Sequence, residues 1–168
     1  ATPLGIELTR FHSDVLSDCD QQIMWHIGDS GFDMTLSGQV PATLGQHLPG
    51  RLPMLLDGAD PADICHWAVH PGGRTVLDAV EQALAQSIDW RAADALACAR
   101  QVLRDYGNMS SPTLMFVLKA LQQTVLQHKA PAGPGCAMAF GPGIALESFL
   151  FNLTDPQPGK LSGKAAPL

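Results

Sequence analysis

The feature that most constrains this chain is a short apolar run, from Ile64 to Val69, that stops abruptly at His70-Pro71-Gly72-Gly73. Apart from His66, every residue of the run is apolar, which is typical of a strand covered on both faces. Such cover requires other elements packed on either side of a sheet. The sequence therefore predicts a layered fold with this run as a central strand.

Strand-like and helix-like segments alternate on both sides of this run. We expect strands at 4–16, 23–27, 32–36, 136–140 and 144–153, helices at 41–56, 75–84, 92–103 and 112–128, and loops at 105–111 and 130–135. The first three strands suggest a hairpin or a meander, with a turn at Asp29-Ser30-Gly31. This alternation indicates an α/β fold.

Prolines and serines set the expected ends of the helices. Pro41 suits a first helical turn, whereas Pro49 and Pro53 are expected to break or kink the helix that follows it. Ser110 or Ser111 is expected to cap the helix that begins at residue 112, because a serine side chain can accept a bond from a free N–H group there.

The composition indicates a single folded domain. Of the 168 residues, 46% are hydrophobic and 15% charged, a balance that excludes general disorder. The net charge of −6 argues against nucleic acid or an anionic membrane surface as a partner. No apolar run approaches the roughly 20 residues needed to cross a bilayer. We expect one domain over 1–154 and a loose, flexible tail over 155–168, where Pro, Gly, Lys and Ala dominate.

The 4 cysteines are Cys19, Cys65, Cys98 and Cys136, which lie far apart and form no C-x-x-C pair. This spacing predicts neither a zinc site nor a disulfide framework. The first residues have no basic segment followed by an apolar stretch, so no signal peptide is expected there. We therefore expect reduced thiols in a cytoplasmic protein.

Three local motifs are candidates for a functional site. They are Trp67-Ala68-Val69-His70-Pro71-Gly72-Gly73, Tyr106-Gly107-Asn108-Met109-Ser110-Ser111 and Ala139-Phe140-Gly141-Pro142-Gly143. A histidine at the carboxyl end of a buried strand, beside glycines and a helix start, lies where α/β sheets bind ligands. Taken singly, each motif also has a plain structural explanation: His70 and Asn108 as turn residues, and the third motif as a hairpin turn.

Together, and in this order, the three motifs resemble the C-terminal half of chalcone and stilbene synthases, which are type III polyketide synthases. The resemblance runs from about residue 5 to residue 154, and the spacing between His70 and Asn108 matches that family. Ketoacyl synthase III enzymes share the fold, but Pro71-Gly72-Gly73 after the histidine points to the polyketide branch. The resemblance implies one half of a thiolase-like αβαβα fold, with a mixed sheet and helices on both faces.

The resemblance also implies a chemistry. The family loads an acyl group from coenzyme A onto a cysteine, decarboxylates malonyl-CoA and joins the two by Claisen condensation. Carried over, His70 pairs with the cysteine thiolate and donates a hydrogen bond to the thioester carbonyl. Asn108 is the second donor of this oxyanion hole, and its neutral amide works at any pH. Acyl-CoA and malonyl-CoA are the substrates, and no further cofactor or metal is implied.

Other positions carry over as substrate-binding residues. Gly72, Gly73 and Thr75 fall where the family's loop meets coenzyme A, while Ser110, Phe140, Gly141, Pro142 and Gly143 fall on the chain-elongation cavity. Met34 stands where plant enzymes have a gatekeeper phenylalanine, and Ala139 stands where the plant loop begins with glycine. Methionine is unbranched and adaptable, which suggests a different or wider tunnel.

The nucleophile itself is missing, because none of the cysteines stands at the start of a buried helix as the family requires. The resemblance implies that an N-terminal half supplies it, in a protein that is a homodimer when complete. Leu114 to Leu118 is apolar around the whole helix, which predicts packing in an interior shared with that half. The alternatives are a ketoacyl synthase III-like enzyme of lipid synthesis and a non-catalytic, thiolase-fold binding or dimerisation module.

Overall fold

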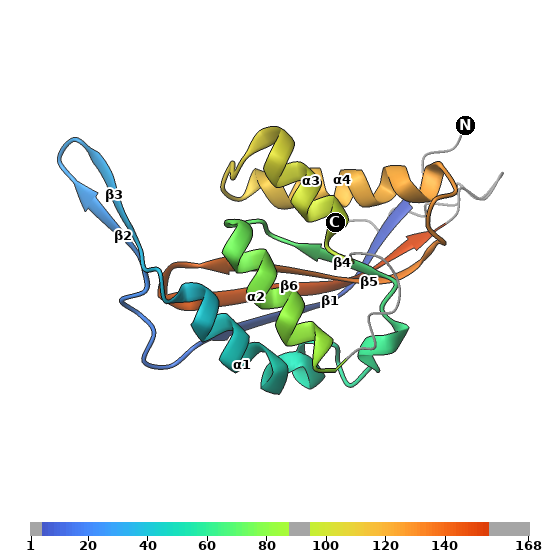
Figure 1. Cartoon of the computed structure of the whole chain (residues 1–168), viewed down its shortest axis with the longest axis horizontal. Helices are drawn as coiled ribbons and strands as arrows, with labels where there is room; N and C mark the ends of the chain where they lie inside the picture. Colours follow the sequence, from blue (N-terminus) through green and yellow to red (C-terminus); the bar gives the residue numbers. More distant parts are fainter. Residues whose placement is uncertain (1–4, 88–94, 155–168) are drawn as a thin grey trace, which may run out of the picture.

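The computed structural model describes residues 5–87 and 95–154, and it folds them around a mixed sheet. The strands are β1 (Gly5–Val15), β2 (Ile23–Gly28), β3 (Gly31–Leu36), β4 (His66–Val69), β5 (Gly133–Gly141) and β6 (Ala145–Thr154). The helices are α1 (Val40–Leu55), α2 (Arg74–Ala85), α3 (Ala97–Tyr106) and α4 (Pro112–Leu126), with short 3-10 turns η1 (Pro61–Asp63) and η2 (Pro142–Ile144). Figure 1 shows how these elements form layers.

The main sheet has the order β1-β6-β5-β4, in which β4 and β5 run parallel and the other neighbours are antiparallel. The prediction of a mixed α/β fold is therefore confirmed. Of the two alternatives for the first three strands, the hairpin is confirmed for β2 and β3, and the meander is wrong. β1 leaves its sequence neighbours and pairs with β6, from Gly5 opposite Thr154 to Val15 opposite Ala145. β2 and β3 form a separate two-stranded hairpin, which projects from the body of the molecule (Figure 1).

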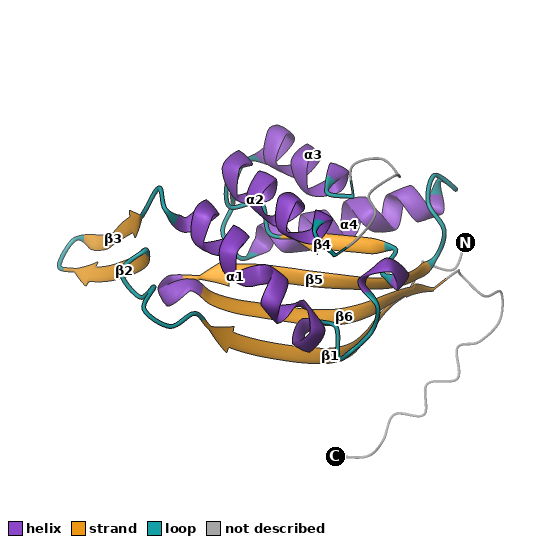
Figure 2. Cartoon of the chain, turned by 60° about the horizontal axis from the view of Figure 1, so that its bottom comes forward, coloured by secondary structure: helices purple, strands orange, loops and turns teal. Residues whose placement is uncertain are grey.

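β4 is buried along its whole length, as predicted, although it lies at one end of the described sheet. Its cover comes from helices: α3 and α4 contact it from one side, and α2 contributes Leu77 and Val80 to the same core. α1 and α2 pack on each other and lie across the sheet (Figure 2). Because helices bury both faces of β4, its sequence is as apolar as that of a central strand.

The expected break in α1 does not occur, since the helix continues past both Pro49 and Pro53. Leu44, Leu48 and Leu52 are buried at a spacing of one turn and hold the helix on the core. Pro53 is exposed and Pro49 is partly exposed. The backbone hydrogen bonds that these prolines cannot make therefore lie outside the buried row of leucines. Packing of the apolar face therefore outweighs the cost of the prolines.

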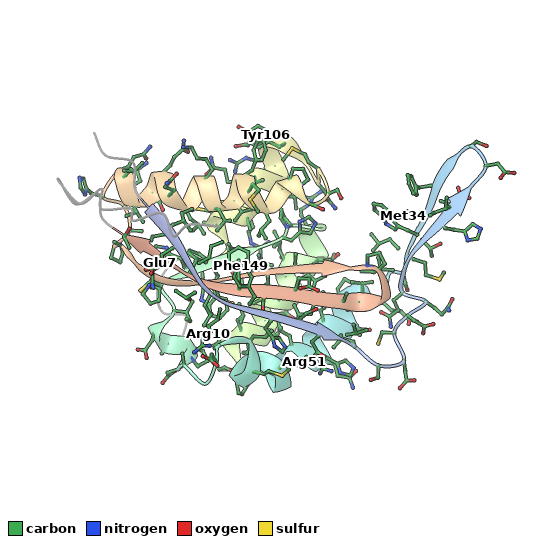
Figure 3. All side chains as sticks on the ribbon, turned by 180° about the vertical axis from the view of Figure 1, so that it is seen from behind. Glu7, Arg10, Met34, Arg51, Tyr106 and Phe149 are labelled. Carbon is green, nitrogen blue, oxygen red and sulfur yellow. The ribbon has the colours of Figure 1, made fainter. Side chains whose placement is uncertain are left out.

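Ion pairs join β1 to the last turns of α1 and to the turn that follows this helix. Arg51 Nε donates to Asp14 Oδ2 at 2.6 Å, and Arg10 Nε lies 3.1 Å from Asp57 Oδ2. Figure 3 shows Arg10 and Arg51 where the strand meets the helix. Asp14 and Arg10 thus mark the helix-covered face of β1, and Phe149, which Figure 3 also labels, belongs to the opposite face of the sheet.

The other helix boundaries match the prediction with small shifts. α2 and α4 are confirmed, whereas α3 continues to Tyr106, into the stretch 105–111 expected to be a loop. Residues 92–94 of that expected helix, and the expected tail over 155–168, lie outside the described residues. Part of the expected loop 130–135 belongs to β5, which begins at Gly133 and pairs with Leu153 of β6.

The prediction that Ser110 or Ser111 caps α4 is wrong. Ser111 makes no side-chain cap bond, and Ser110 adopts a left-handed backbone with φ of 63°. The loop is held instead by Thr113, whose Oγ1 accepts the Met109 N–H at 2.7 Å. Asn108 Oδ1 accepts the Ser110 N–H at 2.9 Å, so an Asx turn takes the place of the serine cap.

The exposed side of α4 agrees with the expectation that this apolar helix is only partly covered by this chain. Leu114, Val117 and Leu118 are buried, but Met115 and Phe116 remain exposed. The Phe116 ring packs on that of Tyr106 in α3, with centroids 5.0 Å apart. The described residues therefore cover only one side of this helix.

Gly135 of β5 leaves room for the Phe151 ring of β6, and we predict that Gly135→Ala destabilises the fold. A Cβ there would lie 2.3 Å from Cζ of Phe151, which is fully buried and has no room to withdraw. Overpacking of this kind costs about 1–3 kcal/mol of unfolding free energy. Urea denaturation measures it, with Gly50→Ala as the control. Gly50 lies inside α1 with open space around it, so that substitution should add about 0.5–1 kcal/mol. Equal stability of Gly135→Ala and the wild type would contradict this packing.

The burial of His66 and His70, at the two ends of β4, predicts loss of stability in acid. Burial lowers the pKa of both imidazoles below the usual value of 6.5, although the bond from His66 Nε2 to the Pro131 carbonyl opposes the shift. The unfolded chain therefore binds more protons than the folded chain as the pH falls through about 6.5, and the unfolding free energy decreases.

The urea midpoint measured between about pH 7.5 and 5.5 should fall, and His70→Asn should flatten this dependence. Replacement of the exposed His26 by Asn is the matched control and should leave the slope as in the wild type. A midpoint that does not change with pH, or an identical slope in His70→Asn, would argue against this role of burial.

Candidate functional site

A cavity with a volume of about 640 Å³ opens beside the carboxyl end of β4. Its walls come from the base of the β2–β3 hairpin, the loop into α2, the α3–α4 loop and the β5–β6 turn. The lining residues are Ile23, Trp25, Met34, Leu36, Val40, His70, Gly72, Val76, Asn108, Ser110, Ser111, Leu114, Met115, Ala139, Phe140, Gly141, Pro142, Ala145 and Glu147. All three motifs of the sequence therefore meet in one place.

His70 reaches this cavity because β4 pairs in parallel with β5. Its backbone N–H donates to the Met138 carbonyl at 2.8 Å, one step beyond the last ladder pair, Val69 with Met138. The side chain is 9% exposed, and its imidazole makes no hydrogen bond within residues 5–87 and 95–154. Burial lowers its pKa, so the ring is neutral at pH 7 and has one N–H to donate and one nitrogen to accept.

Asn108 lines the cavity from a different element, the turn that ends α3. Gly107 closes that helix with φ of 74°, a left-handed conformation that favours glycine. Asn108 Nδ2 then donates to the Gly72 carbonyl at 3.3 Å. Since the amide nitrogen carries two hydrogens, one bond to Gly72 leaves a second donor for a ligand. The asparagine is thereby fastened to the loop that directly follows His70.

The other predicted site residues divide into two groups. Met34, Gly72, Ser110, Phe140, Gly141 and Pro142 line the cavity, whereas Gly73, Thr75 and Gly143 do not. Gly73 precedes α2 as its N-cap residue, and Thr75 lies on a smaller groove between α1 and α2. Gly143, with φ of 73°, supports the shape of the β5–β6 turn without facing the cavity.

Sequence reasoning missed several lining residues. Ile23, Trp25 and Leu36 lie on the same hairpin face as Met34. The alternation of apolar and polar residues in 32–36 is a signal that could have found Leu36, whereas Met24 interrupts this alternation in 23–27. Glu147 carries no such signal. It comes from β6, and its Oε1 accepts a hydrogen bond from Ser13 Oγ of β1 at 2.5 Å.

No cysteine lines this cavity in the part of the chain that the structure describes. Cys19, Cys98 and Cys136 are buried elsewhere, and Cys65 is exposed before the start of β4. Burial raises the pKa of the Cys136 thiol to about 12, so this thiol stays protonated and is a poor nucleophile. The cavity thus offers two hydrogen-bond donors to a carbonyl oxygen but no thiolate to attack it.

The described residues were also considered for a metal site and for a membrane-spanning helix. No three His, Cys, Asp or Glu side chains gather among them in a way that could hold a metal ion. None of the helices described is long and apolar enough to cross a membrane.

Comparison with known proteins places this cavity in a family. The model of the C-terminal domain of chalcone and stilbene synthases matches residues 7–154. Bisdemethoxycurcumin synthase of Oryza sativa subsp. japonica is 32% identical over 158 residues, covering 88% of this chain and 38% of that protein. A putative chalcone synthase of Bacillus subtilis is 33% identical over 151 residues, covering 89% of this chain and 40% of that protein.

A solved structure of a polyketide synthase has the same fold over most of this chain. The crystal structure of PKS-I from the brown alga Ectocarpus siliculosus superimposes with a TM-score of 0.77 at 25% identity, covering 88% of this chain and 39% of that one. The chain thus spans only about two fifths of the length of these relatives. The matched residues contain all three motifs and every wall of the cavity. This chain belongs to the chalcone and stilbene synthase family, and it corresponds to the C-terminal domain of those enzymes.

Proposed function

We propose that this domain is the part of a type III polyketide synthase that holds the enolate and the thioester carbonyl during decarboxylative Claisen condensation. The observation that carries the proposal is the meeting of His70 and Asn108 on one cavity, with Asn108 bonded to the loop that follows His70. The substrates would be an acyl-CoA starter and malonyl-CoA. Gly72, which lines the cavity, and Gly73 and Thr75, which follow it, would meet the coenzyme A arm.

The chemistry needs these two donors at one oxygen. When malonyl-CoA loses CO₂, the electrons of the broken C–C bond move into the thioester, and its oxygen becomes an enolate. The free N–H of Asn108 and the N–H of neutral His70 donate to that oxygen. The enolate carbon then attacks the acyl thioester, a new C–C bond forms, and the thiolate leaves. A pair of fixed donors lowers this barrier because it needs no reorganisation as the charge develops.

The thiolate would come from the cysteine-bearing N-terminal half, which we propose as the partner of this domain. A cysteine placed against His70 would transfer its thiol proton to the unprotonated nitrogen of the imidazole and form a thiolate–imidazolium pair, as in other activated thiols. The cysteines are free, as is typical of proteins in a reducing compartment, so we propose a cytoplasmic protein that is a homodimer when complete.

Exposed apolar side chains on the described domain support the need for such a partner. On β1, Leu8 and Phe11 pair with Phe151 and Phe149 on the sheet face turned away from α1, and both are exposed. Phe11 and Phe149 contact each other with ring centroids 5.8 Å apart. Together with the exposed side of α4, this face presents neighbouring apolar side chains to water, and such surfaces are often sites of protein–protein contact.

We predict that His70→Ala and Asn108→Ala each reduce condensation about a hundredfold or more in the protein that carries both halves. Each variant removes one donor to the enolate oxygen. Turnover of malonyl-CoA to polyketide is the measurement. His26→Ala, on the outer face of the hairpin, is the matched control and should retain activity. Activity of either site variant within about threefold of the wild type would refute the assignment.

We also predict that the 168-residue chain alone is catalytically silent and self-associates. It lacks a thiolate at the cavity, and the apolar faces of β1 and α4 are uncovered. Malonyl-CoA decarboxylation and the mass from light scattering test both statements, and adding the N-terminal half in trans should restore some turnover. A clean monomer, or condensation without any added cysteine domain, would overturn the proposed division into halves.

A further inference from the structure

Glu147 is, besides His70, the only acidic or basic side chain among the described residues that line the cavity. The other lining residues are apolar, are glycines, or carry a hydroxyl or amide group, and none of them is a lysine or an arginine. A negatively charged ligand in this cavity therefore meets a carboxylate, and the described part of the chain offers it no guanidinium or ammonium group.

Strand pairing places Glu147 in one row with His70. Glu147 of β6 lies opposite Ala139 of β5. On the other side of β5, the His70 N–H bonds to the Met138 carbonyl, which brings His70 beside Ala139. Neighbouring strands lie about 4.8 Å apart, so roughly 10 Å separates the Cα atoms of His70 and Glu147. Between them Ala139 contributes only a methyl group, which leaves room for a small ligand.

The carboxylate of Glu147 is held by one contact and is not neutralised. Ser13 Oγ of β1 donates to its Oε1 at 2.5 Å, and no other side chain of the described residues bonds to this carboxylate. Glu147 is exposed in this chain. If the proposed N-terminal half closes the cavity, it removes water around this charge, and electrostatic interactions inside the cavity become stronger.

We propose that the negative charge of Glu147 repels the carboxylate of bound malonyl-CoA and so favours the loss of CO₂. The inference rests on the proposed function, which holds the thioester oxygen at His70 and Asn108. As the bond from the methylene carbon to the carboxylate carbon breaks, its electron pair moves into the thioester, and CO₂ leaves without charge. The negative charge thus moves from the carboxylate to the thioester oxygen, away from Glu147 and toward the two donors.

The small size of the malonyl group keeps its carboxylate within reach of this charge. Hydrogen bonds of about 2.9 Å fix the thioester oxygen at the His70 end of the row. With the malonyl group lying over the methyl group of Ala139, the carboxylate comes within roughly 5 Å of that of Glu147. The other direction, over Trp25 and Met34, would remove water from the carboxylate without giving it a partner.

An ion pair is the rival role for Glu147. In that case a basic side chain of the N-terminal half would neutralise the carboxylate and fasten the two halves together. The two roles differ in a measurable way, because only repulsion of the substrate makes the effect of a substitution at Glu147 depend on the charge of the ligand.

The first test measures the binding of carboxyethyl-CoA and propyl-CoA to the protein that carries both halves, by isothermal titration calorimetry. Both are unreactive thioethers, since they lack the thioester carbonyl, and only the first has the carboxylate of a malonyl group. In Glu147→Gln, which keeps an oxygen for the Ser13 bond, the affinity for carboxyethyl-CoA relative to propyl-CoA should rise about fivefold or more.

Two further variants serve as controls for charge and position. Glu147→Asp keeps the charge and should leave the affinity ratio close to that of the wild type. Glu7→Gln removes the same charge near the other end of β1, roughly 20 Å along the strand from Ser13, and should leave the ratio unchanged.

The second test is the kinetics of malonyl-CoA decarboxylation without a starter. Glu147→Gln should lower kcat about fivefold and lower KM at least as much, so that kcat/KM does not fall. This combination is the signature of repulsion that is lost from the bound substrate, whereas damage to the site would lower kcat/KM.

An unchanged affinity ratio in Glu147→Gln, or a fall in kcat without a fall in KM, would overturn the inference. A lower urea midpoint of Glu147→Gln together with an unchanged ratio would also overturn it and would assign Glu147 to an ion pair between the halves. The condensation proposal fails separately, if the wild-type protein binds neither the thioethers nor malonyl-CoA.

Discussion

The parallel pairing of β4 with β5 is the constraint on which the rest of this structure depends. It sets Val69 against Met138 and then binds the His70 N–H to the Met138 carbonyl, which brings the carboxyl ends of both strands to one edge. At that edge β4 delivers His70 and β5 delivers Phe140, so the cavity forms where strands of α/β sheets generally bind ligands. The close packing of Phe151 on Gly135 keeps β6 in register behind this pair.

The second half of the site depends on a loop rather than on the sheet. α3 ends at Tyr106, Gly107 turns the chain, and Asn108 bonds to the Gly72 carbonyl, so two helices and the β4–α2 loop are joined by one side chain. Because this amide keeps a second donor while the buried imidazole stays neutral, both groups are suited to hold a carbonyl oxygen. They are not suited to start the reaction, which agrees with the proposed supply of the thiolate by another half.

The proposed division into halves would also account for the apolar surface of the domain. The apolar side chains of β1 and the exposed side of α4 are uncovered in a chain that spans about two fifths of the length of its relatives. The hairpin face that carries Trp25 and Met34 is different, since its base lines the cavity. The proposed N-terminal half would cover the sheet and α4 faces.

Local pattern in the sequence determined the buried run of β4, the helices α2 and α4, the β5–β6 turn and the motif residues His70 and Asn108, because each depends on neighbours a few positions away. Tertiary structure decided the rest. Pairing of β1 with β6 joins the ends of the described chain, and the packing of Leu48 and Leu52 carries α1 past its prolines. Whether Thr75 faces the cavity, and which hairpin side chains do, depends on contacts between elements that no local pattern records.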